Sequence, residues 1–328
     1  MATLKYWQAV NRALAEEMER DPSVIVMGED VGAPGGPFGA TAKLRERFGA
    51  SRVRDTPISE AAIVGTALGA AMTGLRPVAE VMFMDFMTLA MDQIVNQAAK
   101  ISYMSAGAYR APMVVRTLVG AGRGTGPQHS QSFEGWLGGV PGLKVVWGAN
   151  PADARGLLKS AIRDDNPVVV VESLSLWTTR GEVPDDPDAV VPIGVAAVVR
   201  PGRDVTAVTW GAAVHRVLAA ADKLAPDIDL EVVDLRTISP LDERTVLESV
   251  SRTGRLVVVH DSPAPYGAGA EIAALVAEKA FAHLRAPVRR VTTPFAPTPF
   301  PPHLEEAFFP GTDDVVKAVN EIMEVGGR

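Results

Sequence analysis

The chain has 328 residues, about the length of two average domains, and 47% hydrophobic against 22% charged residues indicate an ordered globular protein. Its 32 basic and 39 acidic residues give a net charge of −7 without a Lys/Arg block, which argues against a nucleic-acid partner. With no cysteine, disulfides, thiolate metal sites and a cysteine nucleophile are excluded. The first residues follow a helical pattern instead of a signal peptide, and we expect a cytoplasmic protein.

The first half of the chain alternates helices with short apolar strands. Apolar residues recur at helical spacing from Leu4 to Met18. The predicted strands are 24–27, 77–84, 112–118, 143–146 and 168–172, and the further helices are 61–74, 87–104 and 152–163. The longest uncharged run, 61–75, is shorter than the roughly 20 residues that span a bilayer, so no membrane association is expected. We predict one domain over residues 1–185 with a mostly parallel, doubly wound sheet.

Between the two halves, prolines, aspartates and glycines interrupt any helical or strand-like spacing of apolar residues. We interpret residues 186–204 as a linker. Alternation then resumes in a second domain, 205–328, with strands at 205–210, 230–235 and 255–260 and helices at 212–224, 241–250, 269–284 and 313–324. The proline-dense segment 294–310 is expected to cross the surface without forming a central strand or a helix. The predicted fold class is therefore α/β with two doubly wound domains.

Several familiar catalytic motifs are missing. The glycines at 120, 122, 124 and 126 have the wrong spacing for a dinucleotide fingerprint, and no phosphate loop, His-Glu-x-x-His pair or nucleophile elbow occurs. Two polar segments remain, 55–60 with Glu60 before a small-residue helix, and 126–131 with His129 after a predicted strand. Each of these residues also has a structural interpretation when it is taken alone. The helix dipole favours an anion such as Glu60 at the start of a helix, His129 can be a solvated loop residue, and Phe86 can be a core aromatic.

A set of motifs in a fixed order is more specific than any of these residues alone. The chain resembles, over nearly its whole length, the β subunit of the decarboxylating component of pyruvate, branched-chain 2-oxoacid or acetoin dehydrogenase complexes. The motifs that carry the resemblance are Met-Gly-Glu-Asp-Val (27–31), Asp-Thr-Pro-Ile-Ser-Glu (55–60), Met-Asp-Phe (84–86), Asp-Gln (92–93), Gly-Pro-Gln-His-Ser-Gln (126–131), Pro-Gly-Leu-Lys-Val (141–145) and Val-Asp-Leu-Arg-Thr-Ile-Ser-Pro-Leu-Asp (233–242).

The resemblance implies a domain that binds the aminopyrimidine of thiamine diphosphate, followed by a transketolase C-terminal-like domain. It also implies an α2β2 heterotetramer in which the α subunit holds the diphosphate and magnesium through a Gly-Asp-Gly motif, and a lipoyl-bearing acyltransferase as a further partner. No Gly-Asp-Gly occurs in this chain, so the resemblance implies that it is inactive without an α subunit.

Site residues also follow from the resemblance. It implies that Glu60 hydrogen-bonds and protonates the aminopyrimidine, that Phe86 packs on that ring, and that His129 assists substrate handling and acyl transfer. The resemblance also places Glu29 in the cofactor site. Glu29 and Asp92 match acidic residues that resemble an acid-lined connection between paired active sites in this family. A potassium ion is implied at carbonyl oxygens and one carboxylate of Met113, Ala161, Ile162, Asp164 and Asn166.

The implied reaction is oxidative decarboxylation of a 2-oxoacid, or cleavage of acetoin, with acyl transfer to lipoyl groups. Segments 81–86 and 181–184 look closer to acetoin and bacterial pyruvate relatives, and a branched-chain 2-oxoacid is the alternative substrate. Two other functions stay open. One is a transketolase-like or ferredoxin-linked oxidoreductase subunit, and the other is a non-catalytic structural subunit.

Overall fold

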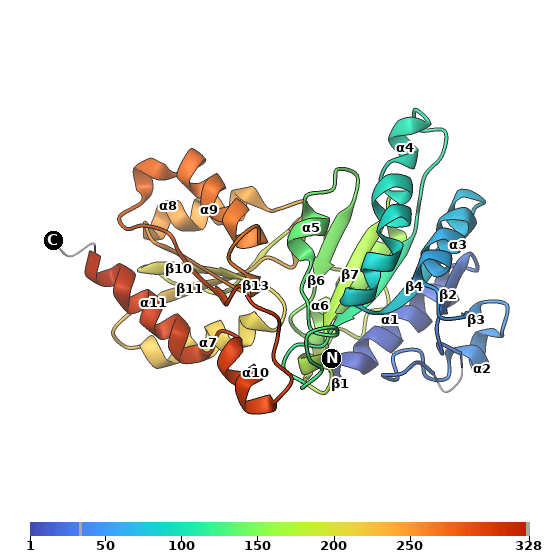
Figure 1. Cartoon of the computed structure of the whole chain (residues 1–328), viewed down its shortest axis with the longest axis horizontal. Coiled ribbons are helices and arrows are strands. Elements are labelled where there is room, and N and C mark those ends of the chain that lie inside the picture. The colour runs from blue at the N-terminus through green and yellow to red at the C-terminus, as the bar shows by residue number, and fades with distance from the viewer. Residues whose placement is uncertain (33–34, 326–328) are drawn as a thin grey trace.

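The structure is a computed structural model that describes residues 1–32 and 35–325, and Figure 1 shows two α/β domains side by side. The N-terminal domain is built on a sheet with the strand order β12-β6-β7-β5-β4-β2-β3. All neighbours are parallel except β12, which runs antiparallel to β6. The strands are β2 (Val24–Gly28), β3 (Val53–Asp55), β4 (Arg76–Phe83), β5 (Val114–Val119), β6 (Lys144–Trp147), β7 (Val168–Ser173) and β12 (Thr237–Ser239).

Helices cover both faces of this sheet, which explains why its central strands are buried throughout. On one face α1 (Tyr6–Arg20) packs against α6 (Pro151–Arg163). The other face carries α3 (Glu60–Met72) with the short helices η1 (Met84–Ala90) and η2 (Asp92–Ala98). The smaller elements are β1 (Ala2–Lys5), which pairs with β8 (Arg180–Val183), and α2 (Leu44–Phe48), α4 (Ile101–Met104), α5 (Glu134–Gly138) and η3 (Leu174–Leu176).

The C-terminal domain has a five-stranded sheet in the order β14-β13-β10-β11-β9. In Figure 1 helices α8 and α9 lie above this sheet and α7 and α11 lie below it. The strands are β9 (Ala197–Arg200), β10 (Val205–Thr209), β11 (Leu230–Asp234), β13 (Leu256–Pro263) and β14 (Arg289–Thr293). The helices are α7 (Ala213–Leu224), α8 (Glu243–Thr253), α9 (Ala268–Lys279), η4 (Phe281–His283), α10 (Pro302–Phe308) and α11 (Thr312–Val325).

Three sequence predictions are corrected here. The single helix predicted at 87–104 is divided into η1, η2 and α4, and Met84, Met87 and Ala90 are buried at every third position, the period of a 3₁₀ helix. The predicted linker contains β9, an exposed edge strand without clean alternation. The proline-dense segment contains α10, which Pro301 and Pro302 begin, because proline is tolerated in the first turn of a helix.

Among the described residues, no helix is both long and apolar enough to cross a membrane.

Candidate active site

Four of the predicted site residues follow the carboxyl ends of adjacent parallel strands. Glu29 follows β2, Glu60 lies beyond β3, Phe86 follows β4, and His129 lies in the loop after β5. These strands are neighbours in the order β5-β4-β2-β3, and parallel pairing brings their carboxyl ends to one edge. Ligands of open α/β sheets bind at this edge. The fold therefore gathers four residues that span a hundred positions of the sequence.

Glu60 is the first residue of α3, and only 9% of its surface is exposed. The preceding Ser59 has an extended backbone and starts the helix, so the carboxyl group lies at the positive end of the helix dipole. Partial burial, with the nearby carboxylates of Asp30 and Glu60, raises the pKa of Glu29. Two acidic side chains, one just after β2 and one at the start of α3, thus lie near each other at the sheet edge.

The imidazole of His129 packs against two phenylalanine rings. Its ring centroid lies 4.9 Å from that of Phe83 and 5.2 Å from that of Phe86, in both cases edge to face. The two phenylalanines contact each other at 5.9 Å, also edge to face. His129 and Phe86 are only half-buried, so a ligand at the sheet edge can reach both rings. The residue that the sequence analysis missed is Phe83, the last residue of β4.

Asp85 is buried beside this aromatic cluster. Its Oδ1 accepts hydrogen bonds from the backbone N–H of Gln131 at 3.2 Å and from the Gln131 amide at 2.8 Å. Burial raises the pKa of Asp85, and the Gln131 hydrogen bonds and the nearby His129 only partly offset this effect. Asp85 therefore joins η1 to the His129 loop, a role that the motif itself did not reveal.

Comparisons with known proteins match both domains. The transketolase pyrimidine-binding domain matches residues 2–178, and the transketolase C-terminal domain matches residues 194–315. The β subunit of acetoin:2,6-dichlorophenolindophenol oxidoreductase from Cupriavidus necator is 46% identical, with 97% of each chain covered. The 2-oxoisovalerate dehydrogenase β subunit of Bacillus subtilis is 45% identical, covering 99% of this chain and 100% of the relative. The pyruvate dehydrogenase E1 β subunit of Rhizobium meliloti is 45% identical, and the match covers 98% of this chain and 70% of the relative.

This chain belongs to the family of β subunits of thiamine-diphosphate-dependent 2-oxoacid and acetoin dehydrogenases. The fold agrees with two solved transketolases. A split-gene transketolase, described as an inactive β4 tetramer, superposes with a TM-score of 0.79 at 24% identity over 97% of this chain and 98% of the other. Transketolase from Leishmania mexicana superposes with a TM-score of 0.72 at 17% identity, and the match covers 100% of this chain and 47% of the other. The predicted α/β architecture and the predicted family are confirmed.

The β-subunit residues at the sheet edge fit an aminopyrimidine ring. Glu60 offers a carboxyl group that can hydrogen-bond a ring nitrogen, and the half-buried Phe86 offers an aromatic surface. Asp92, by contrast, is exposed at the start of η2, where its Oδ1 accepts a hydrogen bond from Asn96 at 2.8 Å. Its connection to Glu29 stays a prediction.

The five residues of the predicted potassium site gather around the end of α6 and the start of β5. The carbonyls of Ile162 and Asp164 each accept from Arg76 Nη1 at 3.0 Å, and the Asp164 carboxylate pairs with Lys144. Asn166 donates to Asp164 Oδ1, Ala161 O accepts from the Asp164 N–H, and Met113 O accepts from the Val168 N–H. Two cationic side chains thus hold oxygens that a potassium ion would need.

The sequence analysis also missed a buried polar chain between the domains. The Glu134 carboxyl at the start of α5 accepts from Ser262 Oγ at 2.6 Å, and that hydroxyl contacts His260 Nδ1 at 2.8 Å. Burial raises the pKa of Glu134, and burial followed by the charge of Arg290 lowers the pKa of His260 to about 4. Since 128 residues separate Glu134 from Ser262, no local pattern could have paired them.

Proposed function

We propose that this chain is the catalytic β subunit of a pyruvate or acetoin dehydrogenase that works with a separate α subunit. The reaction is oxidative decarboxylation of pyruvate, or cleavage of acetoin, with transfer of the acyl unit to lipoyl groups of an acyltransferase component. The observation that carries the proposal is the gathering of Glu29, Glu60, Phe86 and His129 at one edge of the parallel sheet.

The family resemblance suggests a role for each residue, and the positions of the residues at the sheet edge support these roles. Bound thiamine diphosphate supplies a nucleophilic carbon and an electron sink for the substrate carbonyl. Glu60 holds and exchanges a proton with the aminopyrimidine. Burial, followed by the charges of Asp30 and Glu60, raises the pKa of the neighbouring Glu29. Phe86 packs on the cofactor ring. His129 is half-buried, and its imidazole can bind a substrate oxygen or transfer a proton.

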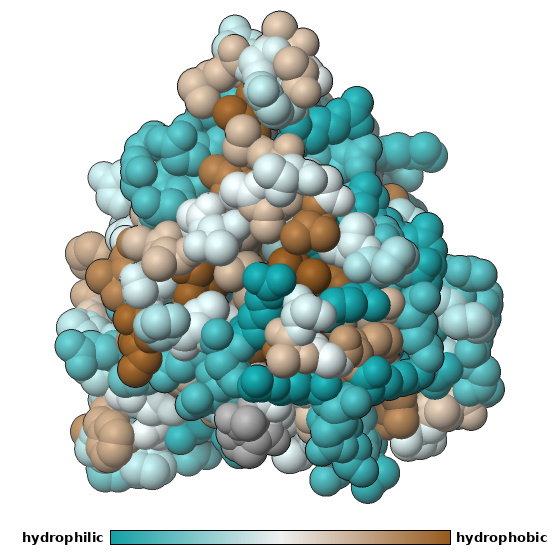
Figure 2. Space-filling view, turned by 90° about the vertical axis from the view of Figure 1, so that its right-hand side faces the viewer, coloured by the Kyte–Doolittle hydropathy of each residue, from teal (hydrophilic) through white to brown (hydrophobic). Residues whose placement is uncertain are grey.

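An α subunit completes the site in this proposal and holds the magnesium and the diphosphate. Large apolar side chains are exposed on the N-terminal domain, among them Ile58 at 74%, Leu89 at 63% and Met104 at 61%. Figure 2 looks onto the N-terminal domain and shows apolar residues mixed with weakly polar ones from its top to its centre, with hydrophilic residues on the right and across the lower part. Such a surface is typical of an interface between subunits. Ile58 lies two residues before Glu60, so this interface would reach the active site.

Sequence identity does not distinguish among the three substrates of the relatives. The relatives named for acetoin, 2-oxoisovalerate and pyruvate share 46%, 45% and 45% identity with this chain, a difference too small to select among them. A branched-chain 2-oxoacid is therefore the second candidate. A non-catalytic subunit is the alternative without chemistry.

The test is reduction of an artificial electron acceptor by the chain co-expressed with its α subunit, supplied with thiamine diphosphate and magnesium. Pyruvate, acetoin and 3-methyl-2-oxobutanoate are offered separately. We expect turnover with pyruvate or acetoin and a loss of at least about a hundredfold in Glu60→Gln, because an amide cannot exchange the proton. The matched control Glu278→Gln, exposed on α9, should keep full turnover. Cofactor binding without turnover on any substrate would refute the catalytic role.

A further inference from the structure

The loop that carries His129 has little structure of its own. Gly122, Gly124 and Gly126 have φ angles of +79°, +66° and +75°, conformations that residues with a side chain rarely adopt. Within the loop, Gly120 N–H donates to His129 O at 3.0 Å, and Thr125 Oγ1 donates to Gly120 O at 3.0 Å. A glycine-rich segment loses much conformational entropy on ordering, so further contacts must hold it.

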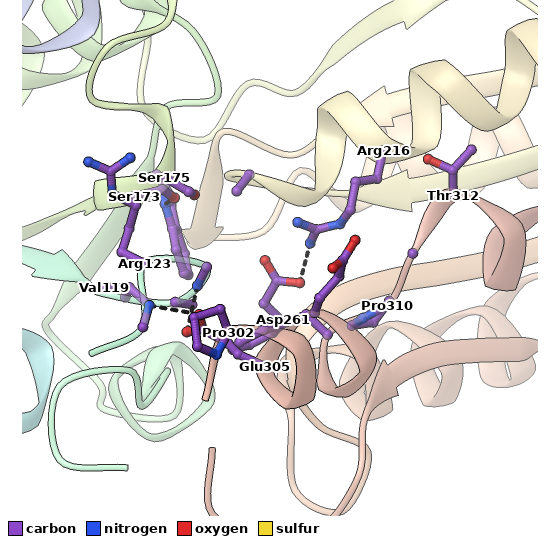
Figure 3. Close-up of a pocket in the computed structure, with 18 residues that line it drawn as sticks. Val119, Arg123, Ser173, Ser175, Arg216, Asp261, Pro302, Glu305, Pro310 and Thr312 are labelled. Carbon is purple, nitrogen blue, oxygen red and sulfur yellow. Dashed lines mark hydrogen bonds and ion pairs between the residues drawn. The ribbon is translucent and has the colours of Figure 1, made fainter. Parts of the chain in front are cut away.

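Besides Asp85, which binds Gln131, the C-terminal domain supplies such contacts. Glu305, on α10, lies more than 180 positions along the chain and is only 4% exposed. Its Oε1 accepts from Gly122 N–H at 3.0 Å, and its Oε2 accepts from Gly124 N–H at 2.7 Å. Figure 3 shows Glu305 reaching across an interdomain cavity of about 580 Å³, with dashed lines to the loop backbone. One carboxylate therefore accepts hydrogen bonds from two N–H groups of the loop, those of Gly122 and Gly124.

The same segment of the C-terminal domain covers the rest of the loop. A Cβ atom built on Gly126 would lie 3.0 Å from Phe300 Cδ2, so the ring of Phe300 rests on the loop backbone three residues before His129. On the far side, the imidazole contacts Phe83 and Phe86. The loop thus lies between β4 and η1 of one domain and the segment before and within α10 of the other.

We propose that Glu305 is a positioning residue for His129, and that through it the C-terminal domain contributes to catalysis without touching substrate. The proposal rests on the function proposed above. A carboxylate suits the task because both oxygens are acceptors, and each accepts from one backbone N–H of the loop. Glutamine has only one oxygen that can accept a hydrogen bond from the loop. Its amide NH2 group would face the second loop N–H, and two donors cannot form a hydrogen bond with each other.

The test compares Glu305→Gln and Glu305→Asp with the control Glu306→Gln in the assembled enzyme. Glu306 neighbours Glu305 on α10 but is exposed. The first readout is hydrogen exchange over residues 120–131, which needs no activity. The second is kcat and KM with pyruvate or acetoin, together with the affinity for thiamine diphosphate.

For Glu305→Gln we expect exchange in the loop to rise at least about tenfold and kcat to fall by a similar factor, since hydrogen bonds to charged groups are the stronger ones. The cofactor affinity and exchange in β10 and β13 should stay unchanged. Glu305→Asp, which keeps two acceptor oxygens on a shorter stem, should lie between the parent and the glutamine variant.

Unchanged loop exchange in Glu305→Gln would overturn the proposal, and so would exchange that rises equally throughout the C-terminal domain. A different outcome is also informative. If the loop exchanges faster in Glu305→Gln than in the parent, but the parent enzyme turns over none of the substrates, the contact between Glu305 and the loop is supported and the proposed function is refuted. The two failures are therefore distinguishable.

Discussion

Asp234 is a fully buried carboxyl group at the end of β11, close to the domain interface. Burial, followed by the charge of nearby Asp153, raises its pKa to about 7, although Arg236 opposes this effect. Arg236 is itself tied to Asp153, with Nη2 and Oδ1 2.8 Å apart. The arrangement gives a stability that depends on pH.

The folded pKa lies above the unfolded value of about 3.9, so the folded chain keeps a proton that the unfolded chain releases. Stability is therefore lost as the pH rises from about 4 through 7. Asp234→Asn cannot ionise, and we expect its gain in the free energy of unfolding over the parent to be larger at pH 8 than at pH 5 by up to about 3 kcal/mol. Denaturant titration at both pH values measures this difference, and an equal gain at both would contradict the prediction.

Motifs in the sequence identify some residues of the candidate site, and others are identified only by the fold. Glu60, Phe86 and His129 are predicted because each lies in a motif that carries the family resemblance. Arg116 illustrates the opposite case, since it is fully buried on β5 and pairs with Glu80 on β4 and Glu172 on β7. In the sequence it is one arginine within an apolar run. Its two partners are identified only by the strand order.

At the level of elements, repeating apolar periods predicted most of the buried strands and long helices. Elements stabilised by distant contacts were missed, because their sequence carries no period of its own. The clearest case is β12, three residues of the C-terminal half that pair antiparallel with β6 and extend the N-terminal sheet. β9 was missed for a similar reason, since an edge strand with exposed residues on both faces looks like a linker.

The junction between α6 and β7 carries the prediction about potassium. A potassium ion bound there would compete with Lys144 for the Asp164 carboxylate. We expect Lys144→Gln to increase the difference in melting temperature between potassium chloride and tetramethylammonium chloride at equal ionic strength by at least about 2 °C.

Asp164→Asn removes the carboxylate and should abolish the potassium-specific difference in melting temperature. Identical melting temperatures in both salts, for the parent and for Lys144→Gln, would show that the five residues form only a structural turn.

For the whole molecule, the sequence predicted two domains but not how closely they interlock. β12 joins the first sheet, Glu305 holds the loop of the N-terminal domain, and Ser262 donates to Glu134. These contacts join residues that are more than 90 positions apart in the chain. Long separations of this kind leave no local signal, although they decide where the active-site loop lies.

The apolar side of the N-terminal domain carries the last prediction. Leu89, on η1, is 63% exposed and lies three residues after Phe86, so a partner that covers it would also border the cofactor site. A charge placed there should weaken the contact with the α subunit, since an interface leaves that charge desolvated and unpaired. We expect Leu89→Glu to lower the amount of α subunit that co-purifies with this chain by at least about tenfold, while the melting temperature of the chain alone stays unchanged.

Phe281→Glu is the matched control, because Phe281 is 74% exposed on η4 of the other domain, and it should retain the α subunit. Size-exclusion chromatography with light scattering then separates the outcomes. If Leu89→Glu still forms the complete assembly, the apolar side of the N-terminal domain is not the α-subunit interface. If both variants lose the α subunit equally, the effect is one of added charge and not of this surface. Loss in Leu89→Glu alone places the α subunit over η1, where it would enclose the edge that holds Glu60 and Phe86.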